Sequence, residues 1–302
     1  MAMDVYWLAV RTCRMKETFS LIGKICGLGS IAISFALFAV TDGRSAPDWQ
    51  LLSPGMELKF VSIHRPDVAL NAPITVLRID AHLWELQAIG AGGTGDNASH
   101  TAREWCEAQE FTAAINAGMF MTDGMTHVGL MRFRGHTNNG AVNNYRSVAA
   151  FDPHDSHLAP FHIFDLDTPQ VTVDSILKDY ESAVQNLRLI KRPGSNQWSK
   201  QSTMWSEAAL GEDDAGRILF IFSRAPFSMH DLNEEMLAAD IGIVAAQHLE
   251  GGPEAQLYVH AGSFKLEQFG SYETAFREND SNPAPLPIPN VLGVRPRRLP
   301  RK

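Results

Sequence analysis

Two carboxylates and a histidine lie close together in the sequence around a short turn. His248 and Glu250 come at the end of an apolar run, and Glu254 follows the turn Gly251-Gly252-Pro253. A tight turn holds the two carboxylates near each other, where their mutual repulsion raises one pKa toward the range that suits a general acid. We therefore predict Glu250 and Glu254 as catalytic residues, with His248 completing the hydrogen-bonded set.

Two further apolar runs end in polar residues followed by glycine or proline. Residues 111–115 lead into Asn116 and Gly118, and residues 218–222 lead into Arg224. If these runs neighbour the first one in a sheet, their polar ends meet at one rim. Glycines at such a rim let the backbone approach a ligand closely. The sequence thus predicts a shared site that combines an amide, a guanidinium, a histidine and two carboxylates.

Each of these signals also has a simpler interpretation. Gly-Gly-Pro by itself indicates a turn. One arginine after a strand is usually a surface charge, and a histidine on an apolar strand, such as His248, is more often a hydrogen-bonded core residue than a catalyst. Two carboxylates across one turn are the part of the pattern that these interpretations leave unexplained.

The remaining pattern predicts a single α+β domain around a mixed β-sheet with flanking helices. Apolar periodicity indicates helices over residues 101–109, 173–180 and 229–239, the last with Ser228 as its N-cap. Short apolar runs indicate strands over residues 74–79, 84–89, 111–115, 218–222, 241–249 and 256–259.

The first fifty residues differ from the rest of the chain. Basic residues precede the uncharged apolar run 25–40, which is the layout of an export signal or membrane anchor, with Met15 as the expected start. We therefore expect a signal or anchor over 1–46, a folded domain over 47–280, and a Pro-rich, basic, mobile tail over 281–302. The expected location is extracytoplasmic, with membrane contact only through the first segment or the tail.

Composition excludes several classes of partner. The formal net charge of −8 argues against a nucleic-acid binder, which needs a basic face. Outside the leader the only cysteine is Cys106, which is predicted to be a small core hydrophobe on a helix. His154 and His157 lie in a proline-bracketed loop without zinc-like spacing. We predict no cofactor and no metal site; a divalent metal is compatible with the carboxylates but not required.

Several segments together resemble the phosphodiester glycosidase family, in its bacterial exported branch. Residues 114–120, Ala-Ile-Asn-Ala-Gly-Met-Phe, are similar to the family's A-x-N-G/A-G-F/M-F stretch. The match spans about residues 55–275, with the motifs in family order. The other matching segments are 128–130, 205–211, 222–232 and 248–255.

The resemblance implies a hydrolase that acts on a sugar-1-phosphodiester or a related glycosidic linkage of an envelope or extracellular glycan. Arg224 would seat the phosphate, because a guanidinium makes two parallel hydrogen bonds to its oxygens. Asn116 would hold a sugar hydroxyl or the oxyanion. The full set of expected substrate- and phosphate-binding residues is Asn116, Gly118, Arg224, His230, Gly251 and Gly252.

The chain departs from the family pattern at two places. Many relatives read D-G-G-G-S where this chain has Glu250-Gly251-Gly252-Pro253-Glu254, and some carry arginine near the position of Ser206. These departures keep a second interpretation open, a glycan-binding envelope protein of the same fold without catalysis. A third interpretation is a membrane-anchored scaffold that uses the leader and the basic tail.

Overall fold

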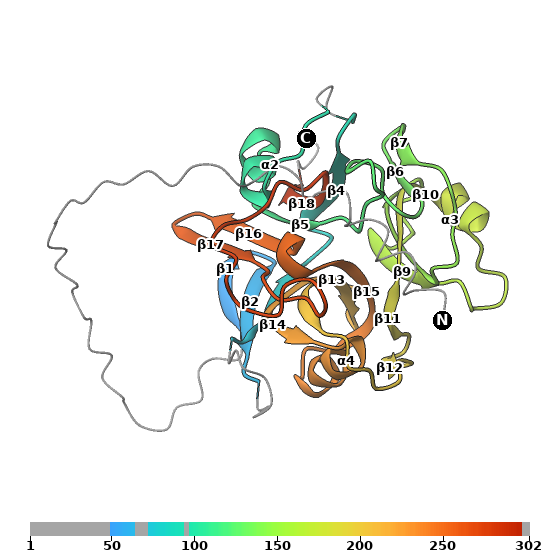
Figure 1. Cartoon of the computed structure of the whole chain (residues 1–302). Helices are drawn as coiled ribbons and strands as arrows, with labels where there is room; N and C mark the ends of the chain where they lie inside the picture. The colour runs from blue at the N-terminus through green and yellow to red at the C-terminus, as the bar shows by residue number, and fades with distance from the viewer. Residues whose placement is uncertain (1–48, 64–71, 94–96, 298–302) are drawn as a thin grey trace, which may run out of the picture. The chain divides into compact units, whose positions relative to one another are not determined.

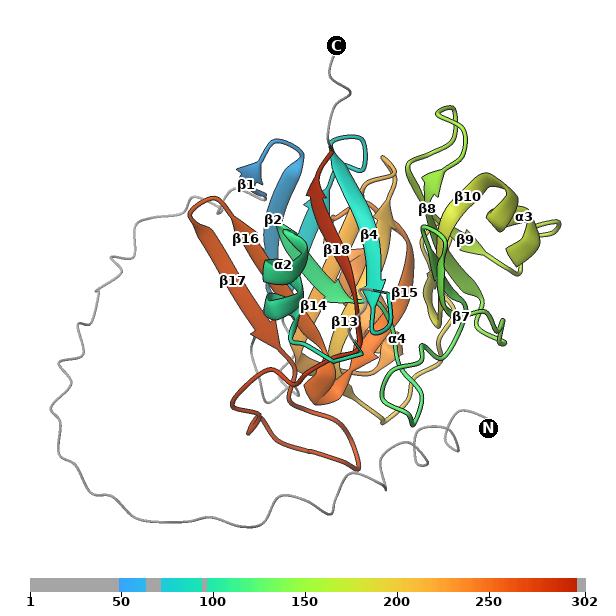
Figure 2. The same ribbon diagram turned by 90° about the horizontal axis from the view of Figure 1, so that it is seen from above.

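The polypeptide from Trp49 onward folds around three antiparallel β-sheets (Figures 1 and 2). The computed structural model describes residues 49–63, 72–93 and 97–297. The expected export segment 1–46, with Met15, lies outside these described residues. In the described ranges, no helix combines the length and the apolar character needed to cross a bilayer.

The largest sheet has eight strands in the order β1-β2-β3-β14-β13-β15-β11-β12. Strand β13 is buried along its whole length although it carries acidic residues, and it pairs with β14 on one side and β15 on the other. The strands are β1 (Gln50–Ser53), β2 (Met56–Val61), β3 (Ile74–Ile79), β11 (Arg188–Lys191), β12 (Ser195–Asn196), β13 (Trp205–Asp213), β14 (Ile218–Phe227) and β15 (Ile243–Gly251).

The two other sheets have five strands each. One has the order β7-β6-β10-β8-β9, with β6 (Met131–Phe133), β7 (His136–Asn139), β8 (Ser147–Pro153), β9 (Phe161–Asp165) and β10 (Tyr180–Asn186). The other has the order β17-β16-β5-β18-β4, with β4 (Trp84–Gly90), β5 (Ala113–Asn116), β16 (Gln256–Ala261), β17 (Phe264–Phe269) and β18 (Asn290–Pro296). A 3-10 turn, η1 (Gly252–Glu254), joins β15 to β16.

One apolar cluster joins all three sheets. Phe220 of β14, Ile115 of β5 and Val184 of β10 belong to it, and all three side chains are inaccessible to solvent. Burial of this apolar surface is the main term that holds the sheets together. The ends of β5, β13 and β15 are thereby brought near each other, although they lie far apart in the sequence.

Three helices cover the outer faces of the sheets. Helix α4 (Met229–Ala238) packs on the face of the eight-stranded sheet that is remote from the shared cluster. Helices α2 (Ala102–Gln109) and α3 (Val173–Asp179) cover the two five-stranded sheets. The predicted N-cap is confirmed: the hydroxyl of Ser228 accepts a hydrogen bond from the Asp231 backbone N–H at 3.2 Å.

The prediction of an α+β domain is confirmed, with antiparallel sheets in place of a single mixed one. The prediction of a mobile tail from residue 281 is wrong, because β18 lies inside a sheet between β5 and β4. Val291, Leu292 and Val294 are fully buried there. The short apolar run between the prolines and arginines is therefore an inner strand, which the flanking composition obscures.

Candidate active site

A carboxylate and an imidazole face each other on two neighbouring buried strands. Glu207 Oε1 of β13 lies 2.5 Å from His248 Nδ1 of β15, and the two side chains are 1% and 0% exposed. The indole Nε1 of Trp205 donates to Glu207 Oε2 at 2.5 Å. The Trp205 ring also meets the His248 ring edge-on, with the centroids 6.2 Å apart. Both oxygens of the carboxylate are thus held by ring nitrogens.

Strand register puts this pair together. In the β13–β15 ladder, Ala209 lies opposite His248 and Glu207 lies opposite Gly251, with an irregularity in between. That irregularity adds one residue, Leu249, to β15, and an extra residue of this kind changes the direction of neighbouring side chains. Because an antiparallel ladder fixes which side chains are neighbours, the pair follows from the register and not from either strand alone.

Burial and charge shift the pKa values of this pair in opposite directions. Burial raises the pKa of Glu207 above its ordinary value, against the charge and hydrogen bond of His248. Burial lowers the pKa of His248, but the charge and hydrogen bond of Glu207 and the charge of Glu250 outweigh it, so the pKa of His248 is raised. The two groups are coupled, so the proton that they bind belongs to the pair and not to either residue alone.

The glycine turn after β15 packs against the same tryptophan. A Cβ added to Gly251 would lie 2.6 Å from Trp205 Cδ1, and Gly252 has a φ of +69° with Glu273 against it. Glycine is required at both positions, by contact at the first and by backbone conformation at the second. Glu250 and Glu254, which flank this turn, are 4% and 8% exposed.

Asn116 fastens β5 to the same turn. Its Nδ2 donates to the Glu254 carbonyl at 3.0 Å, and its Oδ1 accepts from the Gln256 N–H at 2.7 Å. The structure thus brings Asn116 together with the predicted Glu250–Glu254 turn. Both polar atoms of the amide are used in that contact, so Asn116 positions the turn in this structure.

Gly118 makes room for a second buried histidine. A Cβ at this position would lie 2.1 Å from His127 Nε2 and 2.4 Å from Asn186 Oδ1. The Asn186 Nδ2 donates to the Ala117 carbonyl at 2.9 Å, which fixes the loop after β5. Burial lowers the pKa of His127, against the effect of its contacts with Gly129 and Asn186. The pKa of His127 is therefore shifted in the opposite direction to that of His248.

Arg224 points away from the Glu207–His248 pair. It follows Ser223, which lies opposite Glu207, and successive strand residues face opposite sides of a sheet. Its guanidinium donates to the Phe269 and Asn282 carbonyls at 2.6 and 3.1 Å and pairs with Asp280 at 2.6 Å. Arg224 anchors the segment after β17 in this structure, and its phosphate-binding role stays a prediction.

Two other residues named from the sequence have local partners. His230 lies in the first turn of α4, with Nδ1 3.1 Å from Asp231 Oδ1. Cys106 is buried in α2, and burial raises the pKa of its thiol well above the usual range. Cys106 is therefore the inert core residue that the sequence predicts. Ser206, at the departure from the family pattern, accepts backbone N–H bonds from Ser271 and Tyr272.

Sequence reasoning did not assign Glu207 to the site. The signal for it was an acidic residue inside the apolar stretch Trp205–Leu210, matched by a histidine inside another apolar stretch. A charged side chain that is forced into a buried strand needs a partner, because an unpaired buried charge is very costly. That argument identifies Glu207 as unusual, but only the strand register identifies His248 as its partner.

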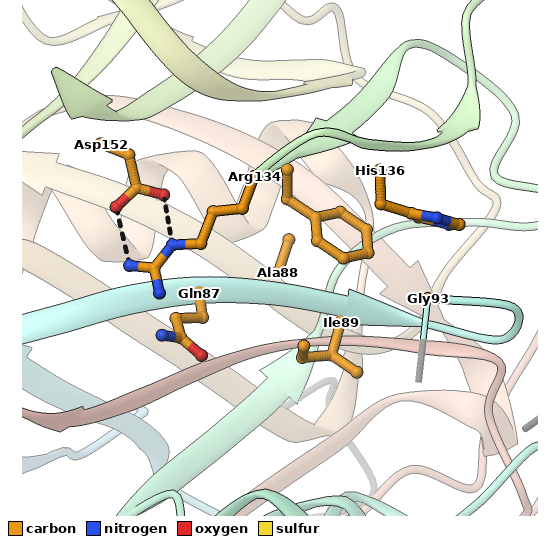
Figure 3. A pocket seen from close by; sticks show the side chains of 8 residues that line it. Gln87, Ala88, Ile89, Gly93, Arg134, His136 and Asp152 are labelled. Carbon is orange, nitrogen blue, oxygen red and sulfur yellow. Dashed lines mark hydrogen bonds and ion pairs between the residues drawn. The ribbon is translucent and has the colours of Figure 1, made fainter. Parts of the chain in front are cut away.

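Within residues 49–63, 72–93 and 97–297, no group of three histidine, cysteine or acidic side chains could hold a metal ion. A surface pocket of about 180 Å³ lies between β4 and the β6–β7 turn (Figure 3). Arg134 points across it to Asp152, at 3.0 Å, and Phe133 and Ile89 supply an apolar wall. None of the residues predicted for the site lines this pocket.

Comparison with protein families gives one match. The model of the phosphodiester glycosidase family matches residues 109–295, which run from the end of α2 to the last inner strand. This range contains β5, β13, β15 and the glycine turn between β15 and β16. No curated protein matches the sequence.

Solved structures that share the fold include the following two. One is the catalytic domain of zebrafish N-acetylglucosamine-1-phosphodiester alpha-N-acetylglucosaminidase, auto-inhibited by its pro-peptide. It has a TM-score of 0.58 at 14% identity over 84% of this chain and 86% of that one. The other is a hypothetical protein from Synechocystis, with a TM-score of 0.56 at 14% identity over 82% of this chain and 64% of that one.

Proposed function

The chain belongs to the phosphodiester glycosidase family, and on that basis we propose that it hydrolyses a sugar-1-phosphodiester or a related glycosidic linkage. The proposed substrate is an envelope or extracellular glycan, and the proposed location is extracytoplasmic, from the charge pattern of residues 1–46. The observation that supports catalysis most directly is the buried Glu207–His248 pair, whose histidine interacts electrostatically with Glu250. Perturbed ionisable groups of this kind gather at active sites.

The proposed reaction exchanges one bond at the sugar carbon C1. The oxygen of a water molecule bonds to C1, and the bond from C1 to the phosphate oxygen breaks. Glu250 accepts a proton from the water as general base, and Glu254 donates a proton to the departing phosphate oxygen. Afterwards a proton passes back from Glu250 to Glu254 through solvent, so both carboxyl groups return to their starting state.

The Glu207–His248 pair is proposed to act through Glu250. His248 carries positive charge when the pair holds its proton, and Glu250 is close enough to raise the pKa of His248. The same attraction favours the ionised carboxylate that a general base requires. His248 is thus a positioning residue in this mechanism, and Glu207 keeps it charged in a buried site.

The test measures turnover of a chromogenic sugar-1-phosphodiester by the purified full chain. Glu250→Gln keeps the size of the side chain and removes its basicity, so kcat should fall by about 10²- to 10⁴-fold with an unchanged melting temperature. Glu212→Gln is the matched control, because it removes a buried carboxylate at the other end of β13. The control should keep the wild-type kcat at a temperature where it is folded.

Two outcomes would count against this mechanism. A fully active Glu250→Gln variant would remove the role of Glu250. Equal losses in Glu250→Gln and Glu212→Gln would mean that the assay reports general damage to β13 and β15. A loss confined to Glu250→Gln would support the proposal.

A second candidate function is glycan binding without hydrolysis. The observation that favours it is Arg224, whose guanidinium is already bound by the protein's own Phe269, Asp280 and Asn282. A phosphate would then have no arginine at this position. Calorimetric binding of a glycan without turnover of any sugar-1-phosphodiester would identify this second function.

A further inference from the structure

A second pocket lies beside the strand that carries His248, and it is lined by residues that the proposed chemistry does not use. It has a volume of about 250 Å³ and is lined by Asn144, Arg146, Leu187, Arg188, Gln197 and Trp198. We call it the Trp198 pocket. It lies where β11 and β12 meet the segment before β8. The Leu187 carbonyl in its wall accepts a hydrogen bond from the His248 N–H at 2.8 Å.

The indole of Trp198 is held in place before any ligand arrives. Its Nε1 donates to the Arg188 carbonyl at 2.8 Å, and its backbone N–H donates to Asn196 Oδ1 at 3.1 Å. Asn196 in turn is bound to α4 through the His230 carbonyl. The ring is partly exposed and packs against the apolar cluster under α4. A fixed, partly exposed aromatic face offers contact area at little entropic cost.

The two arginine side chains that line the pocket are paired with carboxylates. Arg188 Nη1 donates to Asp165 Oδ1 at 2.7 Å and to Asp167 Oδ2 at 2.7 Å. Arg146 Nε lies 3.5 Å from Asp167 Oδ1, and its side chain is 54% exposed. Two guanidinium groups thus face two carboxylates. Such a site offers many directional hydrogen bonds without a strong net field, so it suits a neutral polar ligand better than a multiply charged anion.

The amides of Asn144 and Gln197 complete the polar rim. Both residues are exposed, and Gln197 Nε2 makes one hydrogen bond, to Ser195 Oγ at 2.7 Å. An amide can donate and accept at once, as a sugar hydroxyl can. An aromatic face with amides and guanidinium groups around its edge matches a sugar ring, whose C–H face is apolar and whose edge carries hydroxyls. The volume lies below the range of about 300–1,000 Å³ for sites of drug-sized ligands, which fits one ring.

We propose that the Trp198 pocket is a carbohydrate subsite, which holds one neutral sugar ring of a glycan against Trp198. The position of the subsite next to β15 rests on the proposed function, because it would then bind a part of the substrate away from the reacting bond. Binding energy from such a remote part of a substrate positions the reacting part. The sugar-binding chemistry itself depends only on the six lining residues.

The test is calorimetric titration of the full chain with four neutral trisaccharides: maltotriose, cellotriose, mannotriose and chitotriose. At least one should bind saturably, and Trp198→Ala should raise its Kd about tenfold or more. The matched control is Trp49→Ala, because Trp49 is also a partly buried tryptophan but does not line the pocket; its ring lies 3.7 Å from the guanidinium carbon of Arg78. The control should leave the Kd unchanged.

A second variant covers the case in which Trp198→Ala does not fold. The double variant Asn144→Ala with Gln197→Ala changes only exposed side chains, and it should raise the Kd about threefold or more. No binding of any trisaccharide, equal binding by wild type and both pocket variants, or binding of inorganic phosphate alone would overturn the subsite.

The subsite and the hydrolase proposal can fail separately. Turnover that depends on Glu250, together with trisaccharide binding that ignores Trp198, would overturn the subsite and leave the hydrolase. Trisaccharide binding that depends on Trp198, without turnover of any sugar-1-phosphodiester, would support the subsite and overturn the hydrolase.

Discussion

The two ends of strand β13 each bury a glutamate beside a histidine, yet the pKa values of the two carboxyl groups are shifted in opposite directions. At one end, burial raises the pKa of Glu207, against the effects of His248 and Trp205. At the other end, burial also raises the pKa of Glu212, but hydrogen bonds and charges lower it below its ordinary value on balance. The pKa of the same residue type on the same buried strand is thus raised at one end and lowered at the other.

The difference lies in the kind and the exposure of the partners. Glu212 accepts a hydrogen bond from the Ile163 N–H at 2.6 Å and pairs with Arg192 at 2.7 Å and His162 at 3.1 Å. A carboxylate with several donors and a permanent cation stays ionised. Glu207 is held instead by an indole and an imidazole, neither of which is a permanent cation, and it shares its proton with His248. Glu207 is therefore suited to a role in proton transfer, whereas Glu212 is suited to stabilising the fold as an ionised carboxylate.

Truncating each glutamate in turn should produce the greatest loss of stability. Glu207→Ala leaves His248 fully buried without its counter-charge, which should cost about 3–5 kcal/mol of unfolding free energy. Glu212→Ala should cost about 1–3 kcal/mol, because His162 and Arg192 are 30% and 34% exposed and can turn to water. Urea unfolding of the two variants measures both values. A larger loss in Glu212→Ala would contradict the comparison.

The two ends should also respond to pH in opposite directions. The lowered pKa of Glu212 contributes stability that is present above the unfolded value of about 4.3 and is lost as the pH falls through the folded value. The raised pKa of His248 contributes stability that is present below the unfolded value of about 6.5 and is lost as the pH rises through the folded value. Both of these contributions are complete only between these two unfolded values, whereas the raised pKa of Glu207 contributes stability that is lost as the pH rises through its folded value.

Variants assign these two pH responses to their groups. In urea unfolding from about pH 3 to 9, Glu212→Gln should remove the loss of stability on the acid side. His248→Gln should remove the loss that begins above about pH 6.5. If His248→Gln leaves the upper response unchanged, the raised pKa of His248 is not its source.

A weaker effect should come from Arg192, the partly exposed cation beside Glu212. Arg192→Met removes the ion pair with Glu212, and because Arg192 is 34% exposed the loss should stay below about 1 kcal/mol. The acid-side loss of stability should move to higher pH, since Glu212 loses its permanent cation. Lys191→Met, at the neighbouring position, is the control. A loss above that of Glu212→Ala would show that Arg192 acts through other contacts.

Much of the fold could be predicted from local pattern. Strand β3 has the predicted bounds, and helices α2, α3 and α4 lie within a residue of theirs at each end. These elements have a clear apolar period and N-cap residues such as Thr101 and Ser228. Strand β18 was not predicted, because prolines and arginines on both sides hide its short apolar run.

The candidate site was predictable only in part. The glycine turn with Glu250 and Glu254, and the proximity of Asn116 to it, follow the expectation that separate strand ends meet. Arg224 shows the limit of that argument: the strand end that carries it was predictable, but the Phe269 and Asn282 carbonyls and the Asp280 carboxylate that hold its guanidinium were not. Glu207 could not be assigned from local pattern either. Its partner, His248, is 41 positions away along the chain, and the pairing of β13 with β15 brings the two together.

Local spacing and residue type were enough to establish the α+β class, the family motifs and the residues that flank the glycine turn. Three contacts depend instead on how the whole chain folds: Glu207 meets His248, Arg224 faces the segment after β17, and Leu187 joins the Trp198 pocket to β15. All three are consequences of strand register. Register is set by burial of the whole apolar core, and it determines which buried charges become neighbours.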